Sequence, residues 1–169
     1  MSAKPASPQS TQWRQVGWRE HIALPEFEVP SLRTKIDTGA RTSALHATDQ
    51  QAFEKNGAQW VSFHISAPGE PRKKRCAAPV LERRDIKNTG GKPEERFIIE
   101  TIVILGKYHW HIEVSLADRE QMEFDMILGR TAIRARHLLV NPGKSFVLGP
   151  PSTFAAKAVA QQINIRVEH

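Results

Sequence analysis

Short stretches of alternating apolar and polar residues, separated by turn residues, fill the centre of this chain and restrict it to a β-rich fold. In residues 32–36, Leu, Thr and Ile alternate with Arg and Lys, and residues 61–65 repeat the alternation. Successive side chains of a strand point to opposite faces, so both segments predict half-buried strands. The other strands that we expect span residues 18–24, 75–86, 97–105, 108–116, 124–128, 138–140 and 145–148. Only residues 130–136 predict an internal helix, so the pattern indicates an all-β barrel or sandwich with one short helix.

Length, charge and cysteine content limit the class of protein. The chain has 169 residues, which suits one domain, and a net charge of +6, which favours acidic partners such as nucleic acid, an anionic membrane or an acidic peptide. Cys76 is the only cysteine, so no intrachain disulfide can form, as is usual in a reducing compartment. No stretch approaches the length of a transmembrane helix. We therefore expect a cytoplasmic protein that does not associate with membranes.

The two ends of the chain differ in composition from its centre. Residues 1–12 are rich in Pro, Ser and Gln and lack the apolar core of a signal peptide, so we expect a disordered tail. Residues 13–149 carry the strand pattern and form the expected domain. Residues 150–169 begin with two prolines and continue with Ala and Gln, which predicts a C-terminal tail that is helical or disordered.

An acidic residue stands directly after the strand at 32–36, in the sequence Asp37-Thr38-Gly39-Ala40. Far downstream, residues 126–130 form an apolar strand that stops at a glycine. Gly39 lets the backbone turn, and its N–H can donate to the Asp37 carboxylate. The Thr38 hydroxyl can bond to backbone of a symmetric partner, and the small Ala40 leaves room beside the site. This arrangement is half of an aspartic peptidase site, although a plain turn at a strand end can have the same sequence.

Peptide hydrolysis by carboxylates requires two of them, because one must be ionised to polarise a water while the other donates a proton to the scissile carbonyl oxygen. Two carboxylates that lie this close share one proton, since both cannot easily be ionised. The chain has one Asp-Thr-Gly only. The sequence therefore predicts that two copies of the chain meet, each supplying Asp37.

From residue 16 to residue 142 the chain resembles the retropepsins, the single-domain aspartic peptidases that work as homodimers. The Asp-Thr-Gly-Ala segment, a hairpin at residues 84–96 with Gly90 and Gly91 at its tip, and an apolar-Gly-Arg-helix segment around Arg130 follow one another in the retropepsin order. The resemblance implies a closed β-barrel and an aspartic endopeptidase. It also implies catalytic roles for Asp37, Thr38 and Gly39, and it makes the hairpin at 84–96 the flap over the substrate.

Residues 35–45 and 122–130 are similar to a bacterial branch of this fold, the retropepsin-like proteins often labelled "ATP-dependent zinc proteases". That branch is associated with the ligase that adds glutamates to a small-subunit ribosomal protein. The resemblance implies trimming of glutamate tails or of the modified ribosomal protein. We therefore expect a glutamate-rich peptide or protein as the substrate, with a glutamylated ribosomal protein as one candidate.

One departure from the viral retropepsins concerns charge. In those enzymes an acidic residue follows the Asp-Thr-Gly-Ala segment and pairs with the arginine at the position of Arg130, whereas this chain has Arg41 there. Either Glu123 or Asp125 neutralises the two cations, or they form an anion site, since arginine binds carboxylates bidentately. On the second alternative Arg41 and Arg130 bind substrate together with Ala40 and the flap glycines, Gly90 and Gly91. A further interpretation is that Arg41 is a solvated structural residue.

Metal and nucleotide sites are not predicted. The chain has no His-Glu-x-x-His and no glycine-rich phosphate loop, and one cysteine cannot form a zinc ribbon. His109, His111 and Glu113 share one face of a strand, where they either bind a metal or, as we expect, are simply its polar face. We therefore predict no metal and no cofactor, and assign the ATP label to a partner protein.

Two further functions compete with the peptidase. The first is a non-catalytic retropepsin-fold module that binds a peptide or the ribosome. The second is a basic RNA-binding β-barrel, for which the run at residues 72–75 with Arg83 and Arg84 would contact RNA; a solvated loop and a contact with an acidic tail are the other interpretations of that run. The complete Asp37-Thr38-Gly39-Ala40 sequence favours the enzyme, because a binding module has no need of the aspartate.

Overall fold

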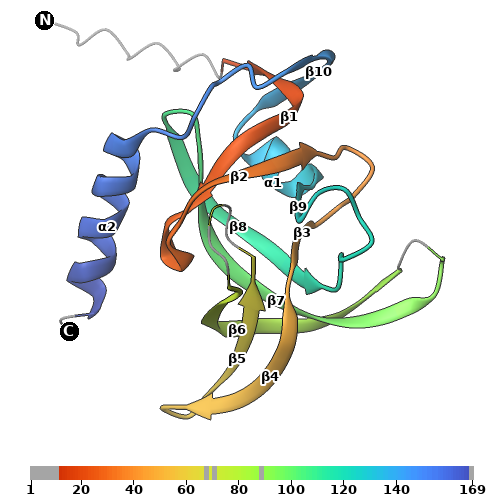
Figure 1. Ribbon diagram of the computed structural model, residues 1–169, viewed down its shortest axis with the longest axis vertical. Helices are drawn as coiled ribbons and strands as arrows, with labels where there is room; N and C mark the ends of the chain where they lie inside the picture. The colour runs from red at the N-terminus through yellow and green to blue at the C-terminus, as the bar shows by residue number, and fades with distance from the viewer. Residues whose placement is uncertain (1–11, 67–68, 70–71, 88–89, 168–169) are drawn as a thin grey trace, which may run out of the picture.

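Strands account for most of the computed structural model, which describes residues 12–66, 69, 72–87 and 90–167 (Figure 1). The strands are β1 (Arg14–Leu24), β2 (Val29–Ile36), β3 (Ser43–His46), β4 (Thr48–Lys55), β5 (Ala58–Ile65), β6 (Lys74–Lys87), β7 (Pro93–Leu105), β8 (Tyr108–Ala117), β9 (Met126–Leu128) and β10 (Leu138–Ser145). The helices are the 3-10 turn η1 (Pro25–Phe27), α1 (Arg130–Ala135) and α2 (Thr153–Val167). The structure thus confirms the all-β fold; α1 is the short helix that was expected, and η1 was not predicted.

The strands form one sheet that closes on itself. Their order is β10-β1-β2-β9-β3-β8-β7-β6-β5-β4, and a further pairing of β1 with β7 completes a ring. In that pairing Ile22 lies opposite Leu105 and Ala23 opposite Ile104. Strands β4, β5 and β6 extend the sheet beyond the ring, with the β4–β5 hairpin at the bottom of Figure 1. The ring encloses the apolar core. Loops that connect its strands are therefore anchored at both ends.

The predicted alternation decides which side chains fill the core. Leu32 and Ile36 of β2 are buried, whereas Arg33 and Lys35 between them are exposed. Val61, Phe63 and Ile65 of β5 are buried in the same cluster. Each such apolar side chain contributes roughly 1.5–3 kcal/mol when it is fully removed from water. The strand interpretation of these two segments is therefore confirmed.

The end of the sheet differs from the prediction. Residues 138–140 and 145–148 were expected to be two strands around a turn at Asn141-Pro142-Gly143, but β10 runs without interruption from Leu138 to Ser145. It pairs in parallel with β1 and has no partner on its other side among the residues that are described. Proline is tolerated on such an edge strand, because its missing N–H is not needed there. Residues 146–148 lie beyond the strand.

Strands β3 and β4 were not predicted. β3 is only four residues long, and all four are buried, so it shows no alternation. Most of the β4 side chains are exposed and polar, so that segment resembles a loop in sequence. Both strands exist because neighbouring strands supply their hydrogen bonds, which is a tertiary effect rather than a local preference.

The C-terminal segment is helical, one of the two forms expected for it. Ala155 and Val159 of α2 are buried, and Ala155 packs in a small cluster with Ala23 of β1 and Ile104 of β7. Helix α2 therefore covers the outside of the ring at the pairing of β1 with β7 (Figure 1). The disordered tail predicted for residues 1–12 lies, apart from Gln12, outside the described residues. In the part of the chain described, no helix is both long enough and apolar enough to span a bilayer.

Candidate active site

The aspartate loop begins where two parallel strands end side by side. β2 pairs with β9 in parallel, with Ile36 opposite Leu128. The backbone N–H of Asp37 continues this ladder by donating to the carbonyl oxygen of Leu128 (2.8 Å). The two segments singled out in the sequence, 90 residues apart, are thus joined at the level of Asp37.

The loop itself holds one oxygen of the Asp37 carboxylate. The N–H of Gly39 donates to Oδ1 of Asp37 (2.9 Å), and the N–H of Ala40 approaches the Asp37 carbonyl oxygen (3.4 Å). This backbone donor fixes the orientation of the carboxylate. The second oxygen, Oδ2, accepts no hydrogen bond from any residue that the structure describes. Asp37 is partly exposed, so this oxygen is accessible to a substrate or a water.

The β9–α1 connection clamps the other side of the loop. The N–H of Arg130 donates to the carbonyl oxygen of Ala40 (2.8 Å), and the N–H of Thr131 donates to that of Arg41 (3.1 Å). The Arg130 guanidinium reaches the carbonyl oxygen of Thr38 through Nη1 (3.0 Å). These three hydrogen bonds, accepted by the carbonyl oxygens of Thr38, Ala40 and Arg41, fix the backbone of the aspartate loop.

Gly129 is required at this clamp because the two backbones approach closely. A Cβ atom at position 129 would lie 2.6 Å from the carbonyl carbon of Thr42. The Gly129 N–H also donates to Oγ of the buried Ser43 (3.0 Å), and Oγ of Ser115 donates to the Ser43 carbonyl oxygen (3.2 Å). The position therefore admits only glycine without displacement of the aspartate loop.

A groove of about 760 Å³ opens beside the Asp37 carboxylate. Seven basic and three acidic side chains line it, so it is strongly cationic. The basic residues are Lys35, Arg41, Arg84, Lys87, Arg96, Arg119 and Arg130, and the acidic ones are Asp37, Asp85 and Glu123. Positive side chains concentrated in a concave site attract anionic groups more strongly than the same charges on an open surface.

Most of the predicted site residues meet at this groove. Asp37, Gly39, Ala40, Arg41 and Arg130 line it, while Thr38 is exposed beside it. Among the described residues, no acidic group lies within ion-pair distance of either arginine, because Glu123 pairs with Arg33 instead (3.4 Å) and Asp125 pairs with neither. The geometry thus fits the anion-site alternative for these two arginines.

The two glycines predicted for the flap, Gly90 and Gly91, are not among the described residues that line the groove. β6 and β7 pair as far as Lys87 opposite Pro93, so the predicted hairpin exists. Gly90 and Gly91 follow at its far end and are exposed, and the described part of the groove extends along β6 only to Lys87. The first two residues of the predicted turn, Asn88 and Thr89, lie outside the described residues.

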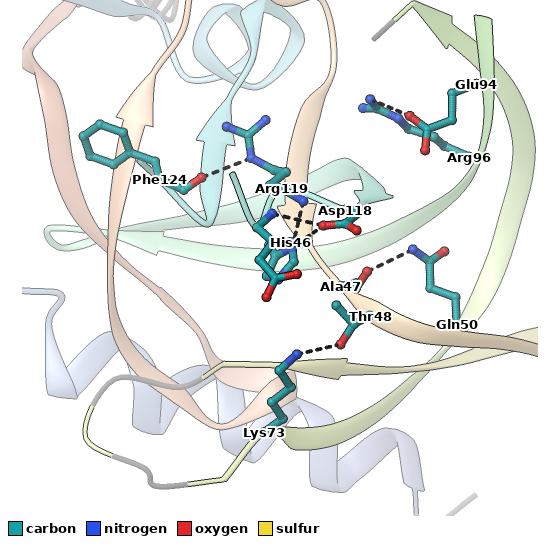
Figure 2. Close-up of polar contacts among 11 residues, drawn as sticks. His46, Ala47, Thr48, Gln50, Lys73, Glu94, Arg96, Asp118, Arg119 and Phe124 are labelled. Carbon is teal, nitrogen blue, oxygen red and sulfur yellow. Dashed lines mark hydrogen bonds and ion pairs between the residues drawn. The ribbon is translucent and has the colours of Figure 1, made fainter. Parts of the chain in front are cut away.

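Sequence reasoning missed Arg119 and the site roles of Arg84 and Arg96. The Arg119 backbone N–H donates to Nδ1 of His46 (2.8 Å), and its Nε donates to the Phe124 carbonyl oxygen (3.1 Å), as Figure 2 shows. Burial lowers the pKa of the Arg119 guanidinium and Arg96 lowers it further, while Asp37 and Asp125 raise it. No sequence signal distinguishes Arg119 from the other charged residues of its loop, because only the closed ring brings that loop to Asp37.

Arg84 connects β6, a strand of the hairpin predicted to be the flap, to the aspartate side of the groove. It forms ion pairs with Glu82 and Glu113 and donates to Oγ1 of Thr42 (3.2 Å). The predicted basic run is also partly paired, since Lys74 contacts Glu28 (2.9 Å). Arg84 and Lys74 are therefore held by ion pairs.

Two of the three residues considered for a metal, His111 and Glu113, have other partners. His111 lies 3.3 Å from Glu100, and Glu113 pairs with Arg84. Within the described ranges, no three His, Cys, Asp or Glu side chains gather as a metal site would require.

Comparison with known proteins agrees with this geometry. A family model described as "Retropepsin-like aspartic endopeptidase RimB" matches residues 15–151. Proteins named "Probable alpha-L-glutamate ligase" from Shewanella halifaxensis and Desulfotalea psychrophila are 38% and 39% identical over 136 and 139 residues. These matches cover 79% and 81% of this chain but only 30% of each relative, so the chain spans about three-tenths of their length.

A solved structure supports the fold. The crystal structure of a protein of unknown function from Legionella pneumophila superimposes with a TM-score of 0.70 at 24% identity, covering 80% of this chain and 98% of that one. At this identity the likeness concerns the fold alone. Taken with the family match over most of the chain, it leads to one conclusion: the chain belongs to the RimB-like family of retropepsin-like aspartic endopeptidases.

Proposed function

We propose that this protein is an aspartic endopeptidase that acts as a homodimer, with Asp37 of each copy forming the catalytic pair. The observation that carries the proposal is the state of the Asp37 carboxylate. Its Oδ1 is held by the Gly39 N–H, its Oδ2 has no partner among the described residues, and the groove begins beside it. A carboxylate that is oriented but not saturated with hydrogen bonds can still bind and polarise a water.

The chemistry requires a second carboxylate, and a second copy of the chain supplies it. The two Asp37 side chains share one proton, so the pair titrates as a unit. The ionised member removes a proton from the attacking water, and the protonated member donates to the oxygen of the scissile carbonyl. Backbone bonds from Gly39, Arg130 and Thr131 keep the loop in position during these transfers.

The groove favours a substrate rich in glutamate. Its seven basic side chains against three acidic ones would attract a polyanionic peptide, and Arg41 and Arg130 lie next to the catalytic loop. The relatives point the same way, because a segment similar to this chain is part of proteins named as glutamate ligases. A glutamate-tailed protein, such as a glutamylated ribosomal protein, is therefore the candidate substrate.

A non-catalytic module that binds acidic peptides through the same groove is the second candidate. The cationic lining fits it equally well. The two functions differ in Asp37: a binding module for acidic peptides has no use for a carboxylate beside its site, which repels the ligand.

Asp37→Asn distinguishes the two candidates, because it keeps the shape of the side chain but cannot provide the ionised carboxylate. We expect cleavage of a glutamate-rich peptide to fall by about 10³-fold or more, with an almost unchanged melting temperature. Mass spectrometry of the products measures it. Asp49→Asn serves as the control, because Asp49 is an exposed aspartate with φ of 50° that pairs with Arg75, away from the groove, and asparagine tolerates that conformation. Equal cleavage by wild type and Asp37→Asn would contradict the peptidase.

A further inference from the structure

We infer that Arg119, with Arg96 beside it, is the receptor for an acidic side chain of the bound peptide, at a subsite separate from Arg41 and Arg130. The inference rests on the proposed function, since it assigns a specificity residue to the same groove. Arg119 and Arg96 both line that groove together with Asp37. Figure 2 shows the two side chains, Arg119 on the loop before β9 and Arg96 on β7.

Arg119 is held at its base and unpaired at its tip. Its backbone N–H and its Nε are both bonded, to Nδ1 of His46 and to the Phe124 carbonyl oxygen. Both partners are themselves fixed, because Phe124 is buried and the buried His46 donates its own N–H to the Asp125 carbonyl oxygen (2.6 Å). The two terminal nitrogens of the guanidinium have no hydrogen-bond or ion-pair partner in the described part of the chain. A rigid fork with its two terminal nitrogens open matches a carboxylate.

Arg96 adds a second cation whose hydrogen bonds are incomplete. Its Nη2 contacts Glu94 (3.3 Å), but its Nε is buried without a partner. The Arg96 charge also disfavours the charged form of Arg119, which lowers its pKa. An anion between the two guanidinium groups would relieve this repulsion.

The protein's own acids do not take that place. Asp37 and Asp125 act on Arg119 electrostatically, yet neither lies within ion-pair distance of it. An acidic side chain of the peptide substrate suits the site. Under the proposed function Asp37 faces the scissile peptide bond, and Arg119 and Arg96 line the same groove, so a side chain of the same peptide can reach them. Subsite binding of this kind places a glutamate at a fixed distance from the scissile bond.

Binding to the inactive Asp37→Asn protein tests the inference without requiring cleavage. The probe is a fluorescein-labelled decamer of glutamate, compared with a decamer of glutamine, with anisotropy as the readout. We expect Arg119→Met to weaken binding of the glutamate peptide by about ten-fold. The matched control is Arg134→Met, which removes the same charge from an exposed arginine of α1 outside the groove and should change the affinity less than two-fold. Equal losses for both variants would overturn the inference.

A second measurement leaves the arginine in place, in case Arg119→Met does not fold. In the Asp37→Asn protein, the side-chain Nε–Hε resonance of Arg119 should shift when the glutamate peptide is added, while that of Arg134 stays still. An Arg119 resonance that does not respond at saturating peptide would overturn the inference. The inference would also be overturned if the Arg119 resonance shifted on addition of a single-stranded oligonucleotide but not on addition of the glutamate peptide.

The outcomes separate this inference from the proposed function. If wild type cleaves glutamate peptides and Arg119→Met cleaves them with unchanged kcat/KM, the peptidase stands and the subsite is wrong. If wild type cleaves nothing but Arg119 governs peptide binding, the subsite stands and the peptidase is wrong.

Discussion

Two carboxylates on neighbouring strands, Glu20 of β1 and Asp37 after β2, have opposite environments. Glu20 is completely buried and accepts three backbone hydrogen bonds, from the N–H groups of Gly17 (2.7 Å), Val147 (2.8 Å) and Leu148 (3.0 Å). Asp37 is partly exposed and accepts one, from Gly39 (2.9 Å). The first group holds the segment after β10 against β1, whereas the second faces a groove.

The contrast shows what makes one carboxylate of this fold stabilise the structure and leaves the other available for catalysis. When backbone donors occupy both oxygens, as for Glu20, the group stabilises the structure, and its removal leaves several donors without partners. When one oxygen is oriented and the other left open, as for Asp37, the group can bind water or substrate. Backbone N–H groups bind both carboxylates, so the two roles differ in the number of N–H donors, three for Glu20 and one for Asp37.

The largest expected effect on stability comes from Glu20→Ala. It leaves three N–H groups without their acceptor, and each costs roughly 1–3 kcal/mol when buried. We expect the free energy of unfolding to fall by about 3 kcal/mol or more, measured by urea denaturation. Glu123→Ala is the control, because that exposed glutamate has only a surface pair with Arg33 and should change stability by about 0.5 kcal/mol or less. A Glu20→Ala protein as stable as the control would break the comparison.

Gly17 and Gly129 allow the surroundings of Glu20 and of Asp37 to be disturbed separately. A Cβ at Gly17 would lie 2.4 Å from the Lys144 carbonyl oxygen beside the Glu20 clasp, and one at Gly129 would lie 2.6 Å from Thr42 beside the Asp37 loop. We expect each alanine variant to lose about 1–3 kcal/mol of stability. Below its melting temperature, Gly17→Ala should keep normal kcat, whereas Gly129→Ala should lose activity because the aspartate loop moves. Equal activity losses would mean that the loop is not specifically positioned by Gly129.

Arg41→Ala should have the smallest effect, and one confined to specificity. Arg41 is exposed at the groove with no acidic partner among the described residues, so its removal costs little stability. A charge-assisted bond to a glutamate contributes about 1.5–3 kcal/mol, so kcat/KM for a glutamate peptide should fall about ten-fold or more at low salt. The matched glutamine peptide should be affected much less. Equal losses on both peptides would make Arg41 a structural residue.

The parts of the molecule that could be predicted are those encoded locally. The alternation in residues 32–36 and the Asp-Thr-Gly-Ala and Leu-Gly-Arg segments carry their own signals, so the strands and the aspartate loop followed from them. Glu20 gave no signal, because its partners are backbone groups, two of them 127 and 128 residues away. Arg119 and the buried strand β3 were missed for the same reason: their roles arise only when the ring closes.

The measurement that tests the central claim most directly is subunit mixing. Wild-type and Asp37→Asn chains are combined in varying proportions at a fixed total concentration that allows exchange, and cleavage of a glutamate-rich peptide is followed. If each active site needs Asp37 from two chains, specific activity follows the square of the wild-type fraction, so an equal mixture retains about a quarter of the wild-type activity. An equal mixture that retains about half, with a linear dependence on the wild-type fraction, would show that one chain suffices and would contradict the account.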